Sequence, residues 1–342
     1  MTERLRADLV LEGGGVKGIA LAGAVSMLEE RGYEFPKVAG TSAGALVGSL
    51  VAAGISGNRL RDMMEALDYR TFRDPPPLGR IWKLGVPAAI LTYKGWAKGD
   101  AVRTWVADAL AERNVHTFAD LPLADSGAAP RLQEDPDARY RFVAMVSDLS
   151  GGQLVRLPWD FRRRFGVDPA EASVADAVRA SIAIPFYFRP ARCPDVRSRR
   201  RAWLVDGGML SNFPIDVFDR RDREPRWPTF GIRLSGDPNA ATVNDIRGVY
   251  SLTRAMIATM TGFYDRMHST RPDVLARTIV VDTNGVSATD FSLDRATARR
   301  LFDNGREAAA RFLDGDGVRR PWDFEQYKRD FRTTDDREEV TL

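Results

Sequence analysis

Residues 7–30 read ADLVLEGGGVKGIALAGAVSMLEE. The stretch opens with an apolar run over residues 7–12, which is typical of a buried strand. Three glycines follow at residues 13–15, and an alanine- and leucine-rich pattern of helical period then runs from Gly18 to Glu30. The order predicted for this part of the chain is therefore strand, glycine turn and helix.

A second unit of the same kind begins at Val38, after the first predicted helix. Val38 and Ala39 form a short apolar step that leads into GTSAG, residues 40–44, and a helical pattern follows over residues 45–53. Two strand–turn–helix units in succession favour a parallel sheet that is covered by helices. The sequence therefore predicts an α/β fold.

Further elements follow without an internal repeat or a strong interdomain linker. Strands are expected at residues 142–146, 202–205, 230–234 and 278–281, and helices at residues 101–112, 174–182, 246–267 and 293–312. We expect a core over residues 8–220 and an extension over residues 221–332 that completes the same domain. The charged tail, residues 333–342, is expected to be disordered.

The pattern breaks between Thr71 and Lys98. This segment is rich in proline and carries the aromatic residues Trp82, Tyr93 and Trp96. A mobile cap over a binding site and a plain connecting loop with buried aromatics both fit a segment of this kind, so both interpretations stay open.

The motif GTSAG matches GxSxG, the nucleophile elbow of serine hydrolases. In that motif the serine, here Ser42, stands on a sharp turn between a strand and a helix, and the turn demands small neighbours such as Gly40 and Gly44. The pattern alone is weak, because small residues are common where helices begin. Its place between a predicted strand and a predicted helix makes it strong.

The glycine-rich segment at residues 13–18 places a row of backbone amides at the start of a helix. Such amides and the helix dipole favour negative charge, and an acyl-transfer enzyme needs them for its oxyanion. The same residues also match GxGxxG of dinucleotide-binding proteins. That function requires an acidic residue at the end of the second strand, where Gly40 and the serine turn stand instead.

A serine nucleophile needs a base, and the familiar base is histidine. His116 and His268 are the two histidines of the chain, and neither lies in a recognisable motif. His268 does follow Asp206 in the order serine, aspartate, histidine of the α/β-hydrolases, so a triad remains an alternative. Asp206 itself follows the apolar strand at residues 202–205, which is the position where parallel sheets bind ligands.

Four motifs in this order resemble the patatin-like phospholipases. They are GGGVKG at residues 13–18, GTSAG at residues 40–44, the segment ASIAIP at residues 180–185 with Phe188 and Pro190 after it, and DGG at residues 206–208. The resemblance covers roughly residues 8–220. Taken alone, DGG would be a turn at the end of a strand, and the other motifs give it its meaning.

This resemblance implies a three-layer α/β/α sandwich with a mostly parallel central sheet. It also implies catalysis by a serine–aspartate dyad, Ser42 as the nucleophile and Asp206 as the base, with no histidine, cofactor or catalytic metal. The elbow glycines are Gly40 and Gly44, and Gly207 and Gly208 form the loop after the base. The amides of the implied oxyanion hole are those of Gly13, Gly14, Gly15, Lys17 and Gly18. The chain departs from the family pattern in small ways, with Glu12 before the glycines and Gly208 where many relatives have alanine.

Composition bounds the remaining possibilities. The chain has 342 residues, 44% of them hydrophobic, and a net charge of +3, which does not imply binding to nucleic acid. Its one cysteine, Cys193, excludes a disulfide-stapled scaffold. No apolar run approaches the roughly 20 residues of a membrane-spanning helix, and residues 1–8 lack the apolar core of a secretory signal. We therefore expect a cytoplasmic protein whose contact with a membrane would be peripheral.

These observations predict a lipid acyl hydrolase that acts on phospholipids or lysophospholipids. The alternatives are a soluble carboxylesterase or thioesterase, and a regulator that binds a membrane or a partner and whose active site no longer catalyses a reaction. Two basic runs, residues 162–164 and 199–201, fit either phosphate head groups or a solvated face. The apolar face of the expected helix 246–267 and the cap around Trp82 and Ile90 are candidates for the acyl-chain site or for plain core. The oligomeric state stays open.

Overall fold

The computed structural model has one large sheet with helices packed on it. It describes residues 5–72, 74, 90, 92–123, 136–219, 224–235, 246, 255, 259, 270–288 and 290–332. Three expectations lie wholly or mostly outside these residues: the greater part of the segment 71–98, most of the helix expected at 246–267, and the tail 333–342.

The central sheet has eight strands, seven of them in the order β12-β11-β2-β4-β6-β10-β9, and β7 also pairs with β6. Their bounds are β12 Thr278–Asp282, β11 Thr229–Ser235, β2 Asp8–Leu11, β4 Val38–Thr41, β6 Phe142–Asp148, β10 Arg201–Asp206, β9 Ala191–Pro194 and β7 Gln153–Leu157. The five strands from β12 to β6 are parallel, while β10, β9 and β7 are antiparallel to their neighbours. The expected α/β class with a mostly parallel central sheet is confirmed.

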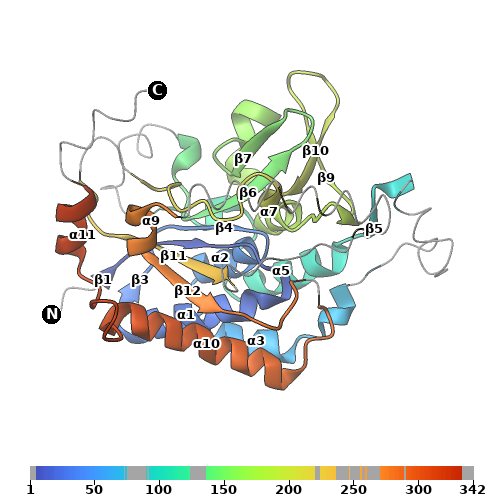
Figure 1. Cartoon of the computed structure of the whole chain (residues 1–342). Helices are drawn as coiled ribbons and strands as arrows, with labels where there is room; N and C mark the ends of the chain where they lie inside the picture. Colours follow the sequence, from blue (N-terminus) through green and yellow to red (C-terminus); the bar gives the residue numbers. More distant parts are fainter. Residues whose placement is uncertain are drawn as a thin grey trace.

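Helices cover one face of this sheet in a single apolar core. They are α1 Gly18–Glu30, α2 Ala43–Ala52, α3 Gly57–Ala66, α5 Asp100–Ala111, α7 Val174–Ser181 and α10 Arg295–Asp314. Figure 1 shows α1, α3 and α10 side by side along the sheet. Leu9 and Leu11 of β2 point into this core, whereas Val10 belongs to the core on the opposite face, as the period of two in a strand requires.

The opposite face is covered by shorter segments in the described part of the chain. Phe213, Ile215 and Phe218 pack there with Val274 of α9, Pro272–Ala276. The C-terminal helix α11, Phe324–Phe331, contacts α9. No helix of the described residues is both long and apolar enough to cross a bilayer.

Most expected elements are present within two residues of their predicted bounds. Helix α2 begins two residues before the expected helix, directly after Ser42. The sequence did not predict α3, α11 or the antiparallel strands β7 and β9. It also did not predict two small parallel pairs, β1 Leu5–Arg6 with β3 Tyr33–Glu34, and β5 Gly95–Ala97 with β8 Phe186–Phe188.

Strands β4 and β10 meet end to end along the same edge of β6. Thr41 of β4 is in parallel register with Met145, and Asp206 of β10 is in antiparallel register with Val146, the next residue. Strand β7 pairs with β6 across both of these positions, so it occupies the other edge. Residue 42 and residue 206 therefore arrive at one point from opposite directions. The expectation that Asp206 ends a strand is correct. The premise that this strand is parallel to its neighbours was wrong, because β10 is antiparallel to both β6 and β9.

Candidate active site

Ser42 stands on a strained turn between β4 and α2. Its backbone has φ of 52° and ψ of −120°, a conformation that residues other than glycine rarely adopt. The turn leaves no room for side chains on either side. A Cβ on Gly40 would lie 2.2 Å from the carbonyl oxygen of Gly44, and one on Gly44 would lie 2.2 Å from that of Leu11. The GTSAG sequence thus meets a steric requirement of this turn.

The hydroxyl of Ser42 donates a hydrogen bond of 2.7 Å to Oδ2 of Asp206. Both side chains are buried. The second carboxylate oxygen, Oδ1, accepts a 2.8 Å bond from the amide of Gly208. Burial raises the pKa of Asp206 from the ordinary 3.8 to about 6, and the hydrogen bonds from Ser42 and Gly208 offset this only in part.

Histidine takes no part in this arrangement within the described residues. His116 is exposed after α5, where its backbone amide donates to Asp120. His268 lies outside the described residues.

The glycine segment at residues 13–18 lies beside Ser42, and several of its amides already have acceptors. The amide of Gly13 donates to the Asn212 carbonyl, that of Val16 to the Ala288 carbonyl, and those of Lys17 and Gly18 to carbonyls within the segment itself. Among the described residues, the amides of Gly14, Gly15 and Ala43 have no acceptor. These three are therefore the donors that remain available to a ligand.

Gly15 must be glycine in this structure. Its φ is +57°, and a Cβ at this position would lie 1.9 Å from the backbone oxygen of Ala288. Lys17 directs its side chain away from the loop, because Nζ donates to the Thr283 hydroxyl at 3.2 Å. Burial lowers the pKa of this lysine, while the negative charges of Glu12 and Asp282 act in the other direction.

Two polar side chains that the sequence motifs gave no role, buried Glu12 and half-buried Asn212, hold the glycine segment in place. Glu12 accepts a short hydrogen bond from the amide of Leu234 in β11, and its other oxygen lies 3.5 Å from Nε of Arg233. Asn212 donates to the Gly13 carbonyl at 3.2 Å. The only sign of this in the sequence was an acidic residue at the end of an apolar strand.

Ser181, the last residue of α7, supports the turn at Ser42 through its hydroxyl group. Its Oγ accepts a 3.0 Å bond from the amide of Ser42 and donates a 2.7 Å bond to the carbonyl of Met145. One hydroxyl therefore ties the elbow to β6. Ser181 lies in the ASIAIP motif, yet no spacing rule assigned it this contact.

We expect Ser181→Ala to lower kcat about tenfold and leave KM nearly unchanged. The change leaves the buried amide of Ser42 without an acceptor, which costs about 1–3 kcal/mol and relaxes the strained turn. Steady-state kinetics and thermal melts measure both effects. Ser49→Ala is the matched control, because Ser49 is also buried but its hydroxyl only bonds the Leu46 carbonyl. Equal kinetic losses in both variants would contradict the positioning role.

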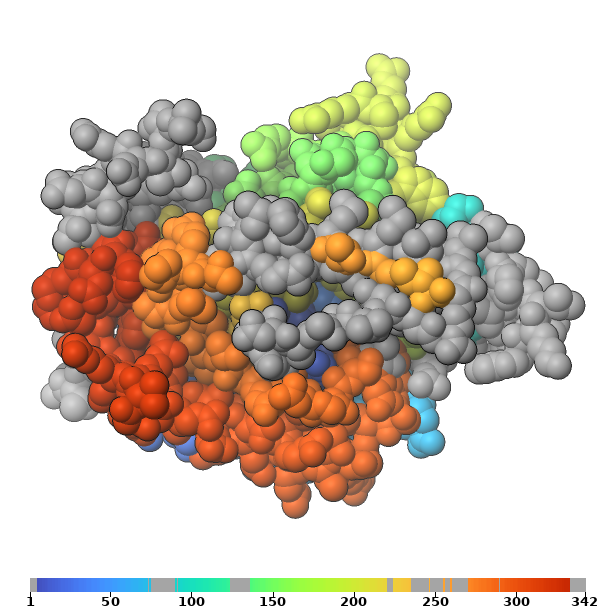
Figure 2. Space-filling view, in the orientation of Figure 1, coloured from blue at the N-terminus to red at the C-terminus, as the bar shows by residue number. Residues whose placement is uncertain are grey.

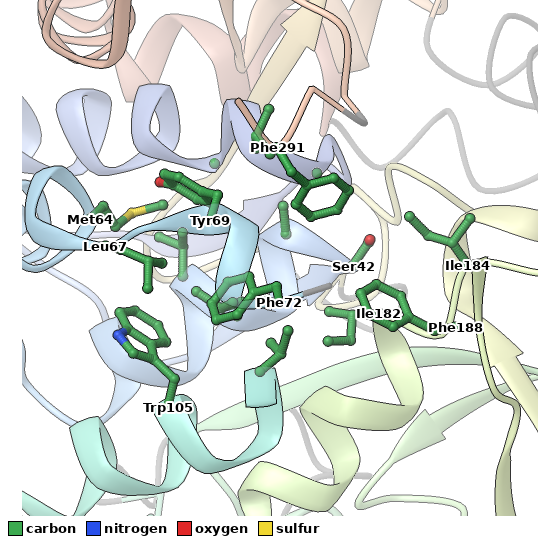
Figure 3. A pocket seen from close by; sticks show the side chains of 17 residues that line it. Ser42, Met64, Leu67, Tyr69, Phe72, Trp105, Ile182, Ile184, Phe188 and Phe291 are labelled. Atoms are coloured by element: carbon green, nitrogen blue, oxygen red, sulfur yellow. The ribbon is translucent and has the colours of Figure 1, made fainter. Parts of the chain in front are cut away.

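An apolar pocket opens at Ser42. It encloses about 570 Å³, open mouth included, and almost all of its wall is carbon. In Figure 3 Ser42 lies toward one end, beside Ile184 and Phe188, and the pocket extends toward Met64 and Trp105. The wall is lined by Gly15, Val16, Gly18, Ser42, Ala43, Leu46, Val47, Met64, Leu67, Tyr69, Phe72, Val102, Trp105, Ile182, Ile184, Phe188 and Phe291.

Among the described residues, those that the sequence suggested for an acyl chain do not line this pocket. Ile90 is absent from its wall, Ile246 is exposed, and Trp82 and nearly all of the expected helix 246–267 lie outside the described residues. The described residues hold no group of three or more histidine, cysteine, aspartate or glutamate side chains that could bind a metal ion.

The first basic run is explained by intramolecular ion pairs. Arg162 pairs with Asp137 and Asp168. Arg164 is buried between Asp148 and Asp195, at 2.7 and 2.6 Å. These contacts fit a structural role better than binding of a head group.

Comparisons with a family model and with related proteins point to the same family. The model of patatin-like phospholipases matches residues 9–219. The Bacillus subtilis protein YqhO, itself uncharacterised, is 34% identical over 90% of this chain and 97% of its own length. An uncharacterised NTE family protein of Mycobacterium tuberculosis is 30% identical over 61% of this chain, which spans 44% of that relative.

A solved structure shares the fold. The crystal structure of VipD from Legionella pneumophila aligns with 89% of this chain at a TM-score of 0.50 and 19% identity. The chain spans 66% of that structure. Because the family model covers more than half of the residues and includes both strand–turn–helix units, the chain belongs to the patatin-like phospholipase family.

Proposed function

We propose that this protein hydrolyses carboxylic esters of phospholipids or lysophospholipids, with Ser42 as the nucleophile and Asp206 as the base. The observation that carries the proposal is the 2.7 Å hydrogen bond between Ser42 and Asp206 at the end of an apolar pocket. A nucleophile within hydrogen-bond reach of its base is the geometry that acyl transfer requires.

In the first half of the reaction, Asp206 accepts the proton of Ser42 while Oγ attacks the ester carbonyl. An exposed aspartate, with its pKa near 3.9, is a poor acceptor for a serine proton. Burial raises the pKa of Asp206 to about 6, so the carboxylate is a stronger base and is still ionised at neutral pH. The environment of Asp206 thus suits it to act without histidine.

The tetrahedral oxyanion needs hydrogen-bond donors that are fixed before the reaction begins. The amides of Gly14, Gly15 and Ala43 suit this task because they have no acceptor among the described residues. Gly15 and Ala43 line the pocket together with Ser42, and Gly14 directly precedes Gly15. Glu12 and Asn212 hold the glycine segment that presents two of them. The proposed oxyanion hole therefore has three donors, whereas the family resemblance implies five.

The first half ends when the leaving alcohol takes the proton from Asp206 and departs, leaving an acyl group on Ser42. A water molecule then attacks the acyl-enzyme and gives its proton to Asp206. The bond between the acyl carbon and Oγ then breaks, Asp206 returns its proton to Oγ of Ser42, and the fatty acid leaves.

The shape and chemistry of the pocket favour a lipid as the acyl donor. Its wall includes eight aliphatic or methionine side chains and five aromatic ones, namely Val16, Leu46, Val47, Met64, Leu67, Val102, Ile182, Ile184, Tyr69, Phe72, Trp105, Phe188 and Phe291. Each methylene group that enters such a wall contributes about 0.8 kcal/mol. A longer acyl chain therefore binds more tightly until the pocket is full.

Hydrolysis of a p-nitrophenyl ester series and of phospholipid vesicles tests this proposal. We expect kcat/KM to rise with acyl-chain length, by up to about fourfold for each buried methylene, and vesicle phospholipid to release fatty acid. A preference for the shortest esters, with intact vesicles, would indicate a soluble esterase or thioesterase instead. If wild-type protein is silent on every substrate, the regulatory alternative replaces this one.

A further inference from the structure

An arginine-rich hairpin projects from the sheet beside the proposed active site. Strands β9 and β10 and their turn, residues 191–206, form this arginine hairpin, which stands out at the top of Figure 1 and Figure 2. Its exposed arginines are Arg192, Arg197, Arg199, Arg200 and Arg201. The whole chain has a net charge of only +3, so this is a strong local concentration of positive charge.

The charge of the arginine hairpin is not neutralised within the described structure. None of its five arginines forms an ion pair with a carboxylate of the described residues. Asp195, the acidic residue of the turn, is buried and bonded to Arg164, which holds the pKa of Asp195 well below its usual range. The contrast with the first basic run is clear, because Arg162 and Arg164 are both paired.

Two apolar groups accompany these arginines. Val196 is 51% exposed at the tip of the hairpin. Trp203 is half-buried on β10, with the guanidinium of Arg192 stacked 3.6 Å from its ring. A mixture of arginine, an exposed aliphatic residue and tryptophan suits the boundary between the head groups and the acyl chains of an anionic bilayer. Nucleic acid would use the arginines but not Val196.

Both strands of the arginine hairpin connect directly to the proposed catalytic centre. Strand β10 runs from Arg201 to Asp206, about 17 Å at the rise of a β-strand. Strand β9 begins three residues after Phe188, which lines the pocket. A bilayer held at the turn of the hairpin would therefore lie about one strand length from Asp206, with a single strand joining the two.

We propose that the arginine hairpin docks the protein on anionic phospholipid bilayers and so brings the pocket to its substrate. The benefit of docking rests on the proposed function, because only an enzyme that cleaves lipids gains from it. The docking surface itself is tested by binding alone. The partner is the anionic membrane surface. Arg199 and Arg200 at the turn would bind its phosphate groups, and Val196 beside them would contact its acyl chains.

Vesicle sedimentation tests the docking surface in the Ser42→Ala background, where the lipid stays intact. We expect binding to vesicles of equal parts phosphatidylglycerol and phosphatidylcholine, weak binding to pure phosphatidylcholine, and loss of binding as salt is raised. Arg199→Glu with Arg200→Glu should weaken binding about 25-fold or more, since each arginine near an anionic surface contributes about fivefold. The conservative pair, Arg199→Lys with Arg200→Lys, should retain binding.

The matched control is Arg295→Glu with Arg300→Glu on α10, which makes the same change in charge at exposed positions on the far side of the sheet. Equal weakening in both glutamate pairs, equal binding to neutral vesicles, or binding of heparin or RNA without binding of vesicles would overturn the proposal. A folding defect in the glutamate pair is excluded by a circular dichroism spectrum and a thermal melt that match those of Ser42→Ala. Hairpin-dependent vesicle binding by a protein that cleaves no ester would instead refute the proposed function and leave the docking surface standing.

Discussion

Alanine at position 42 is expected to lower kcat for ester hydrolysis by roughly 10⁴-fold or more, to the background of the assay. The proposed mechanism uses no other nucleophile, because among the described residues Ser42 Oγ is the hydroxyl that bonds to Asp206 and faces the pocket. In the described part of the chain the hydroxyl bonds only to Asp206, so the variant should fold normally. Single-turnover and steady-state assays with a p-nitrophenyl ester measure the loss, and circular dichroism checks the fold.

Two histidine variants and a chelator are the controls for this experiment. We expect His116→Ala and His268→Ala to keep wild-type activity, and the chelator to have no effect. An inactive His268→Ala variant would show that a triad, rather than a dyad, performs the chemistry. An active Ser42→Ala variant would remove Ser42 from the mechanism.

The parallel part of the fold could be predicted because its signals are local. Residues 7–30 carry a strand, a turn and a helix in immediate succession, and the structure has β2 and α1 in those places. The GTSAG turn is also local, since the steric limits on Gly40 and Gly44 come from atoms of the same turn and of β2 beside it. Patterns of period two and 3.6 are sufficient for elements of this kind.

The antiparallel part of the sheet could not be predicted in the same way. Strand β9 reads ARCP and its residues alternate between half-buried and exposed, so it lacks an apolar run. Its pairing with β10, and that of β10 with β6, depends on contacts between distant segments. The sequence therefore predicted that Asp206 ends a strand, but it did not predict that this strand is antiparallel to its neighbours.

The residues that support the candidate site could not be predicted, for a related reason. Ser181 is 139 residues from Ser42, and Glu12 is 222 residues from Leu234, yet each pair forms a hydrogen bond. No periodicity encodes a contact over such a separation. The pocket is similar, since its wall gathers one to three residues each from α1, α2, α3, α5 and β8, with others from the segments between them, and none of these elements carries a lipid-binding pattern by itself.

Asparagine at position 206 should lower kcat by about 10³- to 10⁴-fold, the second largest effect that we expect. Asparagine is close to aspartate in size and can still accept a hydrogen bond from Ser42, but it cannot take the proton. In the wild-type enzyme kcat/KM should fall about tenfold for each pH unit below about 6, as Asp206 becomes protonated, and reach a plateau above pH 7. The residual activity of Asp206→Asn should lack this dependence. A wild-type profile that is flat through pH 6 would contradict the assignment of the base.

The same substitution should make the protein more stable at alkaline pH, which separates a catalytic role from a structural one. Burial raises the pKa of Asp206 to about 6 from an ordinary 3.8, so the folded state holds this proton more tightly than the unfolded state does. The resulting stabilisation is complete below pH 3.8 and is lost as pH rises through about 6. At pH 8 the wild type therefore carries an unfavourable buried charge, on the order of 3 kcal/mol, that asparagine lacks.

Thermal melts at several pH values measure this difference. The melting temperature of Asp206→Asn should exceed that of the wild type by several degrees at pH 8, and the two should converge near pH 4. Ser42→Ala serves as the comparison, because it is inactive but retains the charge of Asp206 and should show no such gain. If Asp206→Asn were destabilised at pH 8 as well as inactive, the carboxylate would be holding the loop together through Gly208, and its loss of activity would no longer identify it as the base. A gain in stability together with a loss of activity is the result expected of a charge that is retained for chemistry.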